Sequence, residues 1–104
     1  MIFQINTDNH LTVSSEYAEK IEAMVVGEVD HFAEHLTRIE VYLSDQNAHK
    51  ETATDKRCNI EVRLKGKPPV VVSDDGATYD QAITGAAAKL KTTLHTIIEK
   101  SRGH

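Results

Sequence analysis

The sequence predicts a single α+β domain in which a four-stranded, mainly antiparallel sheet is covered on one face by two helices. Three observations predict this fold class. Four short segments alternate apolar with polar residues, as half-buried strands do, and two longer segments repeat apolar residues at helical spacing. Their order is β-α-β-β-β-α, which suits strands paired beneath helices. A chain of 104 residues encloses one hydrophobic core, so residues 1–104 are expected to form one domain.

The first strand and the first helix occupy the N-terminal third. The strand is expected over residues 2–6, where apolar and polar positions alternate before a polar turn. The helix is expected to begin after Ser14 or Ser15, either of which can cap its N-terminus, and to continue to about His35. Its apolar positions are Tyr17, Ile21, Met24, Val25, Phe32 and Leu36.

Three further strands are expected in the middle of the chain. Residues 38–44 and 57–64 each alternate strictly, and the inward face of the latter carries Cys58, Ile60, Val62 and Leu64. Residues 45–56 between them are polar and long for a hairpin loop, so this segment is expected to be either mobile or functional. After a proline-containing turn, residues 70–72 form a short β-branched strand, which residues 74–76 close as a turn.

The second helix is expected to begin at a capping box and to run to about Lys100. Thr78 is followed three residues later by Gln81, the pairing that satisfies free backbone donors at a helix start. Gly85 lies inside this helix, where glycine costs about 1 kcal/mol relative to alanine. We interpret it as a point of close approach to the sheet or to the other helix. The apolar face comprises Tyr79, Ala82, Ile83, Ala86, Ala87, Leu90, Leu94, Ile97 and Ile98.

Composition excludes several classes of protein. With 39% hydrophobic and 27% charged residues, the chain resembles an ordinary globular protein. No apolar run approaches the roughly 20 residues of a membrane helix, and the first residues lack the basic region of a signal peptide. The single cysteine cannot form an internal disulfide, as expected in a reducing compartment. The cytoplasm is therefore the expected location, with no membrane partner.

Charge is distributed unevenly along the chain. The formal net charge is -4, but residues 1–37 contribute -6 and the remainder +2. An anionic partner is therefore expected to prefer the C-terminal part, from Arg38 onward.

Motifs that would carry catalysis are weak. The segment from His31 to Glu34 and His35 matches the bare inverzincin pattern, but a catalytic zinc site needs a further ligand and a cleft. Two solvent-facing histidines are the simpler interpretation, with adventitious metal binding as the alternative. Cys58 faces inward and has no assigned base, so it is interpreted as a core residue. Without phosphate loops, Cys-x-x-Cys pairs or calcium loops, we expect no enzyme, cofactor or metal.

Several stretches carry a family resemblance. Residues 32–43, where the first helix passes into the second strand, and residues 79–83 with Ala88-Lys89-Leu90 and Leu94 resemble the ribosome hibernation-promoting factors and ribosome-associated inhibitors, also called protein Y or sigma-54 modulation proteins. Residues 43–47, 55–58 and 85–91 resemble a short, single-domain proteobacterial branch of that family. The resemblance spans nearly the whole chain.

The resemblance implies both a fold and a partner. The implied fold is similar to a double-stranded-RNA-binding domain. The implied partner is ribosomal RNA of the small ribosomal subunit, in its tRNA and mRNA channel, where binding silences translation under stress; neither DNA nor a membrane is implied. The oligomeric state is left open.

The candidate RNA-binding residues are basic groups of the second helix and third strand, because phosphate contacts supply most such affinity. They are Lys89, Lys91, His95, Lys100, Arg102, Arg57 and Arg63. Lys65 and Lys67, in the following turn, can extend this set if the outer face of that strand is open. Lys89 stands at the family's Lys-Leu position, whereas Thr92, His95 and Thr96 stand where basic residues are usual.

The first helix departs from the family pattern and supports an alternative function. It carries one base, Lys20, and six acids, Glu16, Glu19, Glu22, Glu28, Asp30 and Glu34. A protein-protein module that uses this acidic helix to bind a basic partner is therefore the second hypothesis. A third feature is His31 with His35, which in place of basic residues would strengthen RNA contact at acidic pH, because histidine ordinarily titrates near pH 6.5.

Overall fold

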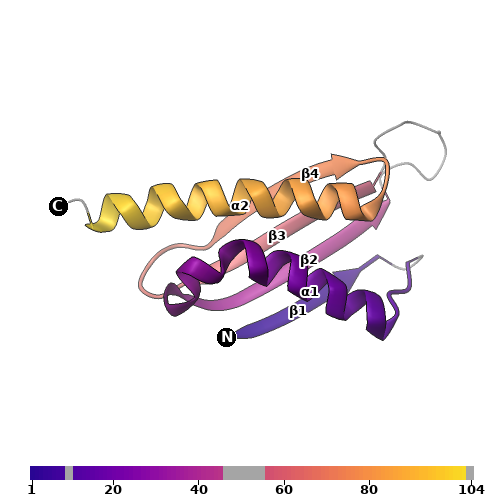
Figure 1. Cartoon of the computed structure of the whole chain (residues 1–104), viewed down its shortest axis with the longest axis horizontal. Coiled ribbons are helices and arrows are strands. Elements are labelled where there is room, and N and C mark those ends of the chain that lie inside the picture. Colours follow the sequence, from indigo (N-terminus) through magenta and orange to yellow (C-terminus); the bar gives the residue numbers. More distant parts are fainter. Residues whose placement is uncertain (9–10, 46–55, 103–104) are drawn as a thin grey trace.

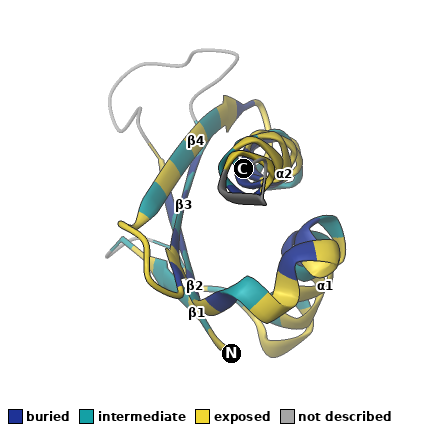
Figure 2. Ribbon diagram, turned by 90° about the vertical axis from the view of Figure 1, so that its left-hand side faces the viewer, coloured by how far each residue is buried: buried dark blue, intermediate teal, exposed yellow. Residues whose placement is uncertain are grey.

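Two layers make up the structure: a four-stranded sheet and two helices that lie side by side on one of its faces (Figure 1; Figure 2). This computed structural model describes residues 1–8, 11–45 and 56–102. The elements in chain order are β1 (Ile2–Thr7), α1 (Ser15–Val29), the 3-10 helix η1 (Asp30–His35), β2 (Leu36–Asp45), β3 (Lys56–Leu64), β4 (Val70–Gly76) and α2 (Tyr79–Arg102). This order confirms the predicted α+β class.

The sheet order is β1-β2-β3-β4. β1 pairs with β2 in parallel, because the chain crosses over through α1 between them, and the other two pairs are antiparallel. One row of paired residues crosses all four strands and faces the helices: Ile5, Val41, Ile60 and Val72. The alternation predicted for each strand therefore sets which face is buried.

The core lies between the inward face of the sheet and the two helices (Figure 2). Helix positions Ile21, Val25, Ile83, Leu90 and Leu94 are each 0% exposed. Among the described residues, no polar or charged side chain is fully buried. Burial of an aliphatic side chain contributes about 1.5–3 kcal/mol, so this apolar layer holds helices and sheet together.

Both helices begin at the expected caps. Ser14, and not Ser15, caps α1, because its hydroxyl accepts a hydrogen bond from the backbone N–H of Tyr17 at 3.1 Å. At α2, the Thr78 hydroxyl accepts from the N–H of Gln81 at 3.1 Å, and the Gln81 side-chain oxygen accepts from the N–H of Ala77 at 2.9 Å. The capping box is therefore confirmed.

Gly85 marks a close approach between α2 and the edge strand β4. A side-chain carbon added at Gly85 would overlap the carboxylate of Asp74, which is tethered at its other side by Lys89. Close approach to the sheet was the predicted role of this glycine, and the structure confirms it.

Two element boundaries differ from expectation. α1 ends at Val29, and the chain continues as η1, which buries Phe32 while the backbone turns back toward β2. β4 does not close at residues 74–76 but extends through them, because Asp74 and Asp75 pair with β3 opposite Cys58 and Arg57. Cross-strand pairing thus overrides the local turn preference of an Asp-Asp-Gly sequence. The segment expected to be mobile or functional, residues 45–56, lies largely outside the described residues.

None of the helices in the described ranges combines the length and the apolar character needed to cross a bilayer.

Candidate nucleic-acid interface

The seven candidate RNA-binding residues lie on two opposite sides of the molecule. Lys89, Lys91, His95 and Lys100 belong to α2, in the helical layer, as does Arg102, whose side chain is outside the description. Arg57 and Arg63 alternate with the buried residues of β3 and so face away from the helices. The structure therefore does not join all seven into one surface.

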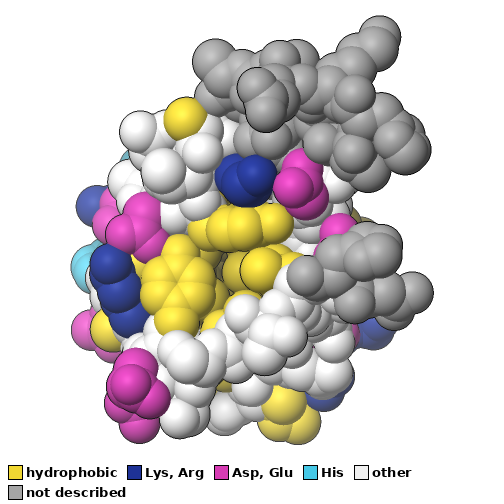
Figure 3. Space-filling model, turned by 90° about the vertical axis from the view of Figure 1, so that its right-hand side faces the viewer, with side chains coloured by type: hydrophobic (Ala, Val, Ile, Leu, Met, Phe, Trp, Pro, Cys, Tyr) yellow, Lys and Arg dark blue, Asp and Glu magenta, His cyan; other side chains and the backbone are white. Residues whose placement is uncertain are grey.

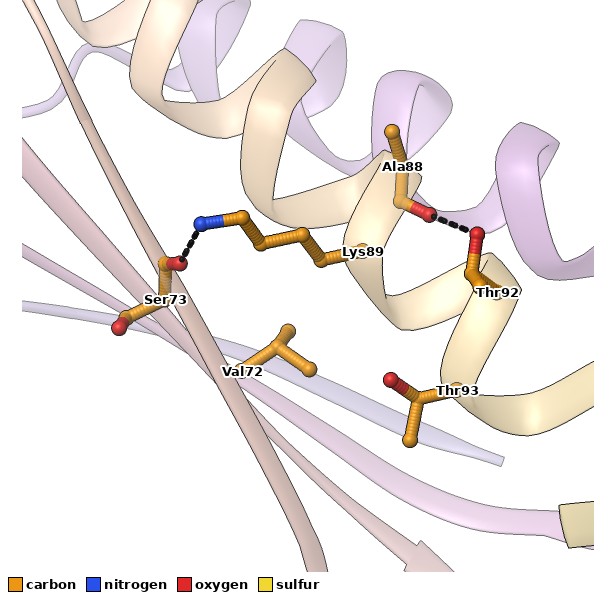
Figure 4. Close-up of a pocket in the computed structure, with 6 residues that line it drawn as sticks. All are labelled: Val72, Ser73, Ala88, Lys89, Thr92 and Thr93. Carbon is orange, nitrogen blue, oxygen red and sulfur yellow. Dashed lines mark hydrogen bonds between the residues drawn. The ribbon is translucent and has the colours of Figure 1, made fainter. Parts of the chain in front are cut away.

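Lys89 lies at the junction of α2 and β4 (Figure 4). Its Nζ donates a hydrogen bond to the backbone carbonyl of Ser73 at 2.9 Å and lies 3.3 Å from Asp74 Oδ1. This contact attaches α2 to β4, which is an edge strand of the sheet. Lys89 therefore has a structural role at this edge, although 56% of its side chain stays exposed.

The arginines of β3 are paired with carboxylates on the open face of the sheet. Arg57 donates to both carboxylate oxygens of Asp75, at 2.8 Å and 3.3 Å, and this hydrogen bonding holds the pKa of Asp75 below its ordinary value. Arg63 lies 3.8 Å from Glu61. Each positive charge on this part of the face is thus offset by a neighbouring strand residue.

The rest of this sheet face satisfies its own polar groups. Glu40 accepts hydrogen bonds from Arg38 Nε at 2.8 Å, the Tyr42 hydroxyl at 2.7 Å and Asn6 Nδ2 at 3.3 Å. The Arg38 and Tyr42 bonds lower the pKa of Glu40, and the same bond to Glu40 raises the pKa of Tyr42. A face whose charges are already neutralised has little attraction for an anion.

Four lysines have no ion-pair partner within the described part of the chain, and we call them the basic end: Lys65, Lys67, Lys91 and Lys100. They come from the β3–β4 turn and from α2, and both this turn and the C-terminal end of α2 lie toward the left of Figure 1. The backbone N–H of Lys65 donates to the carbonyl of His35 at 3.0 Å, so η1 lies at this end as well.

The opposite end has its charges paired. There Lys20 Nζ lies 2.7 Å from Asp80 and Lys56 Nζ 3.2 Å from Asp45, and Figure 3 shows cations beside carboxylates around apolar side chains. The Tyr17 hydroxyl also donates to Asp80, at 2.6 Å. The only basic residue of α1 is therefore already engaged.

A hollow of about 450 Å³ opens between η1 and α2. We call it the histidine notch, and its lining residues are His31, Phe32, Lys91, Thr92, His95 and Thr96. The Phe32 ring lies between the two imidazoles, with centroid distances of 5.2 Å to His31 and 6.4 Å to His95, both edge-on. This site could not be predicted from the sequence, because it needs η1 and α2 to pack together.

The structure also corrects the grouping of His31 with His35. That grouping assumed an α-helix, in which residues four apart share a face, but η1 has the threefold repeat of a 3-10 helix. His35 instead lies 3.5 Å from Glu34. In the part of the chain that is described, no three His, Cys, Asp or Glu side chains are grouped to hold a metal ion, so the inverzincin pattern has no counterpart here.

The fold defines a class of small α+β domains. Comparison with known proteins identifies the family: the model described as Sigma 54 modulation protein / S30EA ribosomal protein matches residues 4–102. The chain belongs to this family. It is therefore a ribosome-associated factor and not an enzyme.

Solved structures share the fold. The N-terminal domain of Thermus thermophilus Protein Y superposes with a TM-score of 0.73 at 22% identity, over 92% of this chain and 97% of that one. A ribosomal subunit interface protein from Coxiella burnetii superposes with a TM-score of 0.70 at 13% identity, over 93% and 97%. None of the curated proteins matches the sequence.

Proposed function

We propose that this protein is a cytoplasmic translation regulator that binds the ribosomal RNA of the small subunit and silences translation under stress. The observation that carries the proposal is the family match over residues 4–102. It is supported by the similarity of the fold to that of a ribosomal subunit interface protein. The basic end supplies the unpaired cations that an RNA partner requires.

The contact surface that we propose is the C-terminal half of α2 with the β3–β4 turn. Lys91 and Lys100 lie on opposite flanks of α2, and neither has an ion-pair partner among the described residues, so a phosphate there need not displace one of their carboxylates. His95 and Arg102 extend the same helix. Lys89 contributes from its place beside Ser73, partly as a support for β4.

Arg57 and Arg63 form a secondary candidate surface. Phosphate binding there would have to replace the contacts with Asp75 and Glu61 and would bring RNA close to those carboxylates. We therefore expect the helical face, and not the sheet face, to meet the ribosome.

A matched pair of variants separates the two faces. Lys91→Gln with Lys100→Gln and Arg57→Gln with Arg63→Gln each remove two positive charges, so any difference between them reflects position and not net charge. Co-sedimentation with 30S subunits at low and moderate salt is expected to show binding by the wild type, a large loss in the lysine variant and a small loss in the arginine variant. The reverse order would place the contact on the sheet face.

The acidic outer side of α1 supports a second function, a protein-protein module with a basic partner. Glu16, Glu19 and Glu22 are all exposed there. Replacing these three by glutamine is expected to leave 30S binding intact or strengthened if RNA is the partner, because repulsion of phosphate falls. Loss of binding in this variant, with no affinity of the wild type for RNA, would favour the protein partner.

A further inference from the structure

The histidine notch brings together two titratable side chains from elements far apart in the sequence. His31 comes from η1 and His95 from α2, and Phe32, which is 4% exposed, separates them. Lys91 is the only permanent charge in the lining, and no carboxylate is among its residues. The hydroxyls of Thr92 and Thr96 donate to α2 carbonyls, at 3.2 Å and 3.1 Å.

We propose that the histidine notch binds a phosphodiester group of RNA, and that protonation of His31 and His95 strengthens this binding. The inference rests on the proposed function, because it assigns a pH-dependent contact to the same RNA partner. Affinity for the ribosome then rises as the pH falls from the neutral range.

The charge of the notch explains why affinity for RNA rises as the pH falls. A phosphodiester stays anionic throughout the range in which histidine titrates, near pH 6.5. With neutral imidazoles Lys91 supplies the only full positive charge of the lining, and each protonated imidazole adds one more. Both nitrogens of a protonated imidazole donate hydrogen bonds, so it also gains a donor for a phosphate oxygen.

Apart from Lys91, the other charged groups next to the two histidines along η1 and α2 are carboxylates. Along α2, Glu99 follows His95 by one turn, and in η1 Asp30 and Glu34 flank His31. None of these three carboxylates is among the residues that line the notch. Carboxylates ordinarily titrate near pH 4, so only imidazoles change charge between about pH 8 and pH 6.

The test is the Kd for 30S subunits at about pH 8 and pH 6, at equal ionic strength. The wild type is expected to bind about tenfold more tightly at pH 6, with a steeper dependence on salt, because each added phosphate contact increases the slope by about 0.7 to 0.9. The variant His31→Gln with His95→Gln is expected to lose most of this pH effect. His35→Gln is the matched control, because His35 lies outside the notch lining and this variant should keep the effect.

A second readout keeps the inference testable if the double variant is unstable. Addition of a short single-stranded RNA to the wild type is expected to shift the imidazole NMR signals of His31 and His95 toward the protonated form, and to leave His35 unchanged. Inorganic phosphate is the comparison ligand, and an equal shift with phosphate alone would assign the notch to free anions instead.

The outcomes separate this inference from the proposed function. Binding that is equal at both pH values, or a pH effect that survives in the double variant, overturns the inference and leaves ribosome binding standing. No binding at either pH, even at low salt, overturns the proposed function and the inference with it.

Discussion

At the scale of single residues, Gly85 sets how closely α2 approaches β4. The Gly85→Ala variant is expected to lower the free energy of unfolding by about 1–2 kcal/mol, because overpacking against Asp74 outweighs the gain in helix propensity. Urea denaturation measures this. Gly27→Ala is the matched control: a side-chain carbon there meets no atom within 4 Å, so a gain of about 0.5–1 kcal/mol is expected.

The clash can be assigned with one further variant. In an Asp74→Ala background the Gly85→Ala change is expected to cost less, because the overlapping carboxylate is gone. An equal cost in both backgrounds would mean that Asp74 is not what excludes the alanine.

Cys58 is the second residue with a measurable consequence. Burial, with a smaller contribution from the nearby Asp74 charge, raises the pKa of its thiol to about 12, and the side chain is 0% exposed. A thiol reagent at pH 8 is therefore expected to react with Cys58 only at the rate at which the protein opens. Reaction of the native protein as fast as of the urea-unfolded chain would contradict this.

At the scale of elements, Asp80 joins the start of α2 to α1. Hydrogen bonds from Lys20 and Tyr17 lower the pKa of Asp80, so the stabilisation is present above the ordinary carboxyl pKa and is lost as the pH falls through the lowered value. Asp80→Asn is expected to lower stability by about 0.5–1 kcal/mol at pH 7, a modest effect because the pair is partly exposed.

The sign of the pH effect provides the check. Urea midpoints of Asp80→Asn and the wild type should converge as the pH falls below the lowered pKa of Asp80, where the wild-type carboxylate is also protonated. Glu22→Gln, on the exposed side of α1, is expected to match the wild type throughout. A gap between Asp80→Asn and the wild type that stays as wide throughout the acid range as at pH 7 would show that the charge of Asp80 is not what matters.

Most elements could be predicted from the regular spacing of apolar residues, because burial of one face of a helix or strand requires that spacing. The alternation around Ile60 and the capping box at Thr78 were sufficient for β3 and the start of α2. The 3-10 turn after Val29 and the extension of β4 through Asp75 could not be predicted, because both depend on contacts with distant segments.

At the scale of the whole molecule, the place of a basic residue in the fold, and not its neighbours in the sequence, decides whether it is available to bind an anion. Lys91 and Lys100 lie on α2, as the sequence predicts. The contacts of Lys89 with Ser73 and of Arg57 with Asp75 could not be predicted from the sequence. The histidine notch was missed for the same reason. A partner on another element, 16 residues away for Lys89 and 18 for Arg57, leaves no local signal.

The cations of the described residues differ in whether they are already paired. Lys20 is held by Asp80, whereas Lys65, Lys67, Lys91 and Lys100 have no ion-pair partner in the described part of the chain, despite the net charge of -4. An RNA surface is therefore expected to meet the basic end first.

The salt dependence of 30S binding tests the central claim most directly. For the wild type, the logarithm of the binding constant should fall linearly with the logarithm of the salt concentration. Replacing Lys91 and Lys100 by glutamine should reduce the slope by about 1.4 to 1.8, because two phosphate contacts are lost. A wild-type affinity that does not change with salt, or an unchanged slope in this variant, would contradict RNA binding through α2.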